Sequence, residues 1–171
     1  FSGIFPPFDK SEWDRYFTLY KEIPQYKLLN YDMTLDEFKI IYYWEYFHRI
    51  LGRIIGLFFL IPLILFYFTN KINKKYLSIC TSIFILILIQ GLVGWYMVKS
   101  GLTQNVSVSH YRLSLHLSIA FIIIGLIYWT IINVKKNTTI SLLYKKRYNY
   151  FFYVLIFLVL TQIILGAFVS G

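Results

Sequence analysis

The chain has 171 residues, of which 58% are hydrophobic and 21% aromatic, and only 15% are charged. Its mean hydropathy of +0.59 excludes an ordinary water-soluble domain of this length. The net charge of +9 would suit a nucleic-acid-binding protein. Because the basic residues lie beside long apolar stretches, membrane topology and anionic lipid explain them better, and no nucleic-acid partner is expected. The composition predicts an all-α, polytopic membrane protein.

Residues 1–34 are mostly polar or mixed and precede the apolar stretches. We expect them to form an outer segment, in the periplasm or the intermembrane space. Two prolines, an Asp/Ser start signal and spaced aromatic residues predict a short amphipathic helix around residues 10–21. The segment lacks the basic start and short apolar core of a cleavable signal peptide.

Four stretches are long and uncharged enough to cross about 30 Å of hydrocarbon as helices. The first has a helical extension from about residue 35, where Thr34 and Glu37 have the spacing of a capping box. We therefore expect residues 35–171 to form a transmembrane helical bundle. The predicted spans are residues 50–69, 76–98, 113–134 and 148–171.

The charged residues are sorted along the chain. All eight acidic residues lie at or before Glu45, and the sequence beyond it carries only basic charge. Basic residues cluster in the connections at 70–75 and 135–147, whereas the connection at 99–112 has only two. By the positive-inside rule, the first two connections face the cytoplasm or its equivalent, and residues 1–34 and 99–112 face outward.

Two histidines are predicted at similar depths near the outer side of the membrane. His48 lies where the chain enters the first span, and His116 lies just after the start of the third, which also runs inward. Two imidazoles that face each other across a helical bundle are common axial ligands of a haem iron, so the pair predicts a haem site. His110 lies in the outer connection, where solvent can satisfy it, and is left out of the site.

A bare metal ion suits the membrane region less well than a haem. The region offers only two histidines, one glutamate and Cys80 far along another span, so tetrahedral zinc is disfavoured. We expect Cys80 to be an apolar filler, and as the single cysteine it forms no internal disulfide.

The residues around the histidines have more than one interpretation. His48, Gly52 and Gly56 recur at four-residue spacing, which would leave a smooth face for a flat macrocycle or let two membrane helices pack closely. Three arginines near the same boundary would bind haem propionates or extend to lipid headgroups. These are Arg49, Arg53 and Arg112.

Glu45 precedes His48 by three positions, which places both on nearly the same helical face. Its carboxylate would orient His48, relay protons in a reaction at the haem edge, or mark the outer interface. The chemistry of the residues alone leaves these three roles open.

Three segments carry a family resemblance: WEYFHRILGRIIG (44–56), GLVGWYMVKSGL (91–102) and VSHYRLSLHL (108–117). They closely resemble segments of heme A synthase of the alphaproteobacterial and mitochondrial type, and PPFDKSEWDRYFTLYKEIPQY is similar to that family's first outer loop. The resemblance implies an enzyme that oxidises the C8 methyl group of heme O to a formyl group, giving heme A for cytochrome c oxidase. It also implies a multi-pass protein of the bacterial inner membrane, or of the mitochondrial inner membrane in a eukaryote.

By this resemblance, His48 and His116 frame the substrate-haem site, and Glu45 matches the acidic residue implicated in catalysis. Family members resemble two four-helix halves in tandem, and the second half carries a haem b. This chain is similar to the second to fifth of the eight spans, so we expect an interior fragment without the first span and the haem b site. The expected partners are heme O, membrane lipid, heme O synthase, cytochrome c oxidase assembly factors and a second copy of the protein.

Two other classes of function stay open at this point. A cytochrome b-like electron-transfer subunit would use the same two histidines as axial ligands without chemistry at the haem edge. Glu45 beside the ligand argues against it. A non-catalytic membrane scaffold would need neither the histidines nor the glutamate.

Overall fold

The structure is a computed structural model, and it describes residues 5–101, 106–135 and 146–170. These residues form helices and no strands, and four of the helices are long and apolar enough to cross a membrane. This confirms the predicted all-α, polytopic class. The helices are α1 (Lys10–Lys21), α2 (Pro24–Leu29), α3 (Leu35–Phe68), α4 (Lys74–Gly101), α5 (His110–Lys135) and α6 (Lys146–Ser170).

The helix α3 begins at the predicted capping box. The backbone N–H of Thr34 donates to the Glu37 carboxylate at 2.8 Å, and the backbone N–H of Glu37 donates to the Thr34 hydroxyl at 3.4 Å. With 34 residues, α3 is about 50 Å long, against about 30 Å of hydrocarbon. Its outer turns therefore extend beyond the membrane, as predicted for the stretch from residue 35.

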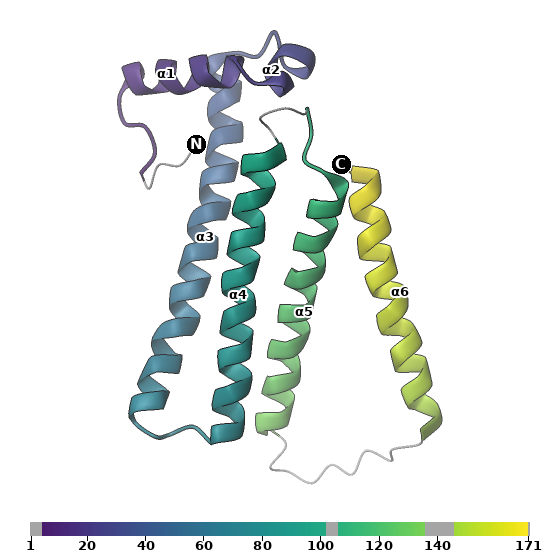
Figure 1. The fold of residues 1–171 in the computed structure, drawn as a ribbon. Coiled ribbons are helices and arrows are strands. Elements are labelled where there is room, and N and C mark those ends of the chain that lie inside the picture. The colour runs from purple at the N-terminus through teal and green to yellow at the C-terminus, as the bar shows by residue number, and fades with distance from the viewer. Residues whose placement is uncertain (1–4, 102–105, 136–145, 171) are drawn as a thin grey trace.

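The outer segment packs on this extension. The predicted helix at 10–21 is confirmed as α1, and α1 and α2 lie across the outer end of α3 (Figure 1). Trp13 and Tyr20 of α1 and Phe38 and Tyr42 of α3 form a buried aromatic cluster. The ring centroids of Tyr20 and Phe38 are 5.0 Å apart, and those of Trp13 and Tyr42 are 5.1 Å apart. Edge and tilted ring contacts of this kind fix α1 on α3.

The four long helices follow one another in a row (Figure 1). Among the described residues, close backbone contacts join α3 with α4, α4 with α5, and α5 with α6, and α3 makes none with α5. Polar side chains add links between α4 and α5, such as the Tyr76 hydroxyl, which donates to the Asn133 carbonyl at 3.3 Å. Because α4 lies between α3 and α5, residues of these two helices can come together only along its surface.

The helix ends agree with the predicted order of connections. The α3–α4 connection lies at the end of the molecule opposite α1 and α2, and so do the inner ends of α5 and α6 (Figure 1). Residues 136–145, which hold much of the second basic connection, lie outside the described residues. The assignment of this end to the cytoplasm stays a prediction.

Candidate functional site

The imidazole of His116 lies against the backbone of α4. A Cβ atom built on Gly94 would be 2.9 Å from His116 Cε1 and 3.5 Å from its Nδ1. Real Cβ contacts are essentially never that short, so only glycine at position 94 admits the ring in this place. No signal in the sequence predicts this role, because the residue that Gly94 contacts lies on another helix.

Gln90 holds the same part of α5 from one turn further inward on α4. Its side-chain amide donates to the His116 carbonyl oxygen at 3.0 Å. Gln90 Oε1 and His116 Nδ1 are buried and have no hydrogen-bond partner among the described residues. Buried polar atoms are usually paired, so these two mark a place where a polar ligand or ordered water would be stabilised. Sequence reasoning missed Gln90, although a glutamine within an apolar span is itself a signal.

The two predicted ligands, His48 and His116, lie on different helices. His48 lies on α3 with an exposed side chain, and it acts electrostatically on His116 of α5. The helices α3 and α5 make no close backbone contact, and α4 lies between them. A flat macrocycle between two axial ligands requires helices that are separated in this way.

The glycines below His48 do not serve close packing within this chain. A Cβ atom at Gly52 or at Gly56 would meet nothing within 4 Å. Of the two interpretations of the four-residue spacing, the described residues therefore fit the open, smooth face rather than a tight helix contact.

Glu45 forms an ion pair with Arg49, one turn further along α3. The two side chains are 29% and 23% exposed, so the pair is partly shielded from solvent. Arg49 Nη2 is buried and has no hydrogen-bond partner among the described residues. The guanidinium thus donates to Glu45 through Nη1, and its Nη2 is available for another anion.

The other two predicted arginines have different surroundings. Arg53 is exposed on α3. Arg112 is half-buried, donates to the hydroxyl of Ser100 on α4, and lies over the Tyr96 ring with Cζ 4.9 Å from the centroid. Arg112 therefore ties the outer end of α5 to α4.

The expectation that His110 lies in the outer connection and is satisfied by solvent is wrong. His110 is the first residue of α5, its side chain is half-buried, and its ring stacks on Phe168 of α6 with centroids 6.0 Å apart. Its Nδ1 is buried without a partner among the described residues. Solvent therefore does not reach Nδ1, and Phe168 of α6 covers one face of the ring.

The donor set fits a haem. The described residues contain no group of three or more histidine, cysteine, aspartate or glutamate side chains that could hold a metal ion. A porphyrin supplies four nitrogen ligands itself, so two imidazoles complete its iron. The orphaned His116 Nδ1 and the glycine cradle at position 94 belong to one of these imidazoles.

A row of apolar helices that are long enough to cross a membrane, with His48 on α3 and His116 on α5, defines a multi-pass membrane protein. The family model COX15-CtaA, described as cytochrome oxidase assembly protein, matches residues 1–171. The chain belongs to this family. Its four membrane-spanning helices and its bacterial relatives make it a multi-pass protein of the inner membrane.

Curated relatives named heme A synthase match almost the whole chain. The one from Pelagibacter ubique is 50% identical over 171 residues, covering 100% of this chain and 50% of the relative. Those from Parvibaculum lavamentivorans and Rickettsia bellii are 42% and 43% identical, covering 99% of this chain and 49% and 51% of the relatives. The chain thus spans about half the length of the relatives it matches. No solved structure matches it.

Proposed function

We propose that this chain provides the substrate-haem half of a heme A synthase, which oxidises the C8 methyl group of heme O to a formyl group. The observation that carries the proposal is the His116 imidazole, which is seated on Gly94 with an orphaned nitrogen, within electrostatic range of His48. The curated relatives that match the chain are named heme A synthase.

In this proposal, His48 and His116 bind the haem iron from its two sides. The arginines of the outer boundary bind the two propionates, which keeps the opposite edge of the macrocycle directed into the membrane. Arg49 is the first choice for this role because its Nη2 is buried and lacks a partner among the described residues. Arg53 and Arg112 are the other two arginines proposed to bind the propionates.

Glu45 is proposed as the proton acceptor. Oxidation of a methyl carbon releases protons, so a carboxylate near the macrocycle edge has a direct use as a base. The ion pair with Arg49 holds the carboxylate in place on α3. When bound, the haem iron would take part in the oxidation, and the electrons removed from the methyl carbon would pass to an acceptor outside this chain, such as the haem b of the family's second half. The upstream partner would be heme O synthase, and the product would go to cytochrome c oxidase through its assembly factors.

The experiment is to replace Glu45 by Gln in the protein expressed from its complete gene. We expect heme A to be lost and heme O or a partly oxidised intermediate to accumulate, because binding survives while proton transfer does not. Extraction and chromatography of the bound haem measure this. The matched control is Asp36→Asn, which removes an acid with 87% exposure at the outer end of α3.

Heme A made at the parental rate by the Glu45→Gln protein would contradict the catalytic role. Glu45 would then only orient His48 or mark the outer interface. The electron-transfer alternative would be favoured instead if the parental protein bound haem through the two histidines and made no heme A. The matches to relatives named heme A synthase do not favour that alternative.

A further inference from the structure

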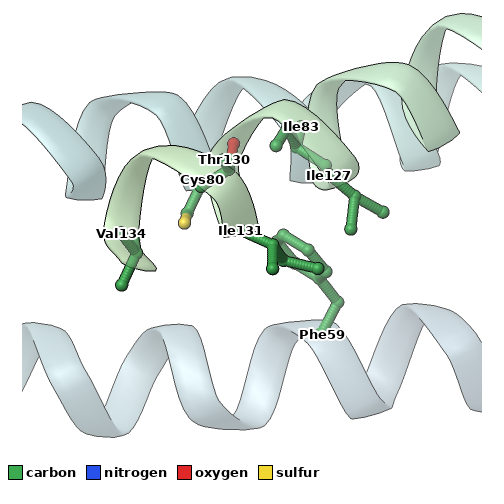
Figure 2. A pocket seen from close by; sticks show the side chains of 7 residues that line it. All are labelled: Phe59, Cys80, Ile83, Ile127, Thr130, Ile131 and Val134. Atoms are coloured by element: carbon green, nitrogen blue, oxygen red, sulfur yellow. The ribbon is translucent and has the colours of Figure 1, made fainter. Parts of the chain in front are cut away.

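An apolar pocket of about 320 Å³ lies between three helices in the inner half of the membrane-spanning region (Figure 2). Phe59 comes from α3, Cys80 and Ile83 from α4, and Ile127 and Ile131 from α5. Figure 2 shows the Phe59 ring pointing from its helix toward the two isoleucines of α5. The pocket is therefore bounded by the same three helices that carry the histidine site.

The pocket and the histidine site are in register. On each of the three helices, a residue of the site and a residue of the pocket are eleven positions apart. The pairs are His48 with Phe59, Gly94 with Ile83, and His116 with Ile127. Eleven residues make about three helical turns, a rise of about 16 Å, and return to within about 20° of the same face. The pocket thus lies directly inward of the histidine pair.

On the α3 face that connects the two, Ile55 lies between His48 and Phe59, and two glycines leave the surface beside it open. Gly52 and Gly56 lie one and two turns inward of His48, and a Cβ atom on either would meet nothing within 4 Å. A thin, flexible chain attached to a macrocycle at the histidines could therefore follow this face down to Phe59.

A polar link between α4 and α5 lies at the inner end of the pocket. The Tyr76 hydroxyl donates to the Asn133 carbonyl at 3.3 Å, which links α4 and α5 one turn inward of Cys80. The link lies at the level of Val134, the innermost residue of α5 that lines the pocket.

We propose that this pocket binds the hydroxyethylfarnesyl tail of heme O. The inference rests on the proposed function. It identifies the farnesyl tail as the part of the substrate that the inner half of the bundle recognises. In heme O the propionates and the tail occupy opposite edges of the porphyrin, so propionates bound at the outer arginines direct the tail inward. An extended farnesyl chain matches the distance of about three helical turns. Because the tail is tethered to the bound macrocycle, it outcompetes free lipid chains for the pocket.

The first test needs no variant. Heme O and heme B, which lacks the tail, are titrated separately into the protein expressed from its complete gene and held in lipid nanodiscs, with Soret absorbance as the readout. We expect heme O to bind at least tenfold more tightly. Equal affinities would overturn the tail pocket while leaving the histidine site intact. Failure of both haems to bind would instead contradict the proposed function.

The second test fills the pocket. Ile127→Trp on α5 and Cys80→Phe on α4 should each reduce heme O affinity at least tenfold and leave heme B affinity unchanged. The matched control is Ile122→Trp, since Ile122 is 45% exposed and lies on another face of α5. Unchanged heme O affinity in both filled variants would overturn the proposal and leave the pocket to a lipid acyl chain. An equal loss for both haems would overturn it too, because the change would then act through the macrocycle site.

Discussion

At the scale of single residues, the position of His116 depends on the absence of a side chain at Gly94. Both residues lie near the outer side, and the ring occupies the space that a methyl group would need. Gln90 supports the same turn of α5 through the His116 carbonyl. The candidate site is therefore built by α4 as much as by the helices that carry the histidines.

Replacing Gly94 by Ala should displace the His116 ring and weaken heme O retention at least tenfold, equivalent to about 1.4 kcal/mol. Haem extracted from the purified protein measures this. Gly91→Ala is the control on the same helix, because a Cβ atom there meets nothing within 4 Å. If both variants retain heme O equally, the packing of His116 on α4 is not needed for binding.

The sequence predicted the types of residue in the site better than their contacts. The histidines, Glu45 and the arginines stand out because charged and polar groups are rare at the mouths of apolar spans. Gly94 and Gln90 were not predicted, because their roles depend on which helix faces His116. The partner of Glu45 was also missed. The spacing in the sequence related this carboxylate to His48, whereas in the structure it pairs with Arg49, four residues further along α3.

At the scale of elements, local signals in the sequence located the start of α3 and the helix α1. The capping box and the aromatic spacing act within one or two turns, so they can be read without knowledge of the fold. The short helix α2 was not predicted, although Pro24 at its first turn is a start signal. The open row of helices was not predicted either. Lipid-facing and protein-facing residues are both apolar, so periodicity does not show which faces pack together.

Replacing Thr34 by Ala should remove the capping box and cost about 1 kcal/mol. The expected sign is a lower midpoint of thermal unfolding in detergent, together with faster proteolysis of the outer segment that packs on α3. Thr81→Ala is the comparison, because the exposed Thr81 hydroxyl bonds only the Leu77 carbonyl of its own helix. A Thr34 variant as stable as the Thr81 variant would show that aromatic packing alone holds the outer segment.

At the scale of the whole molecule, the charge pattern predicts the orientation in the membrane. Alkaline phosphatase fused at Lys74 should be inactive, because that connection faces the cytoplasm and the enzyme matures only on the oxidising side. A fusion at Ser107, in the outer connection, should be active. Activity at Lys74 with none at Ser107 would invert the topology and place the histidine site on the cytoplasmic side.

The account as a whole depends on His48 and His116 holding the substrate haem, and the third histidine supplies the control. Each of His48, His116 and His110 is changed to Gln, and the heme O retained by the purified protein is measured by extraction. His48→Gln and His116→Gln should each reduce it at least tenfold, whereas His110→Gln should retain it, because His110 packs on Phe168 away from the site. Retention of heme O at the parental level in both the His48 and the His116 variants would contradict the account.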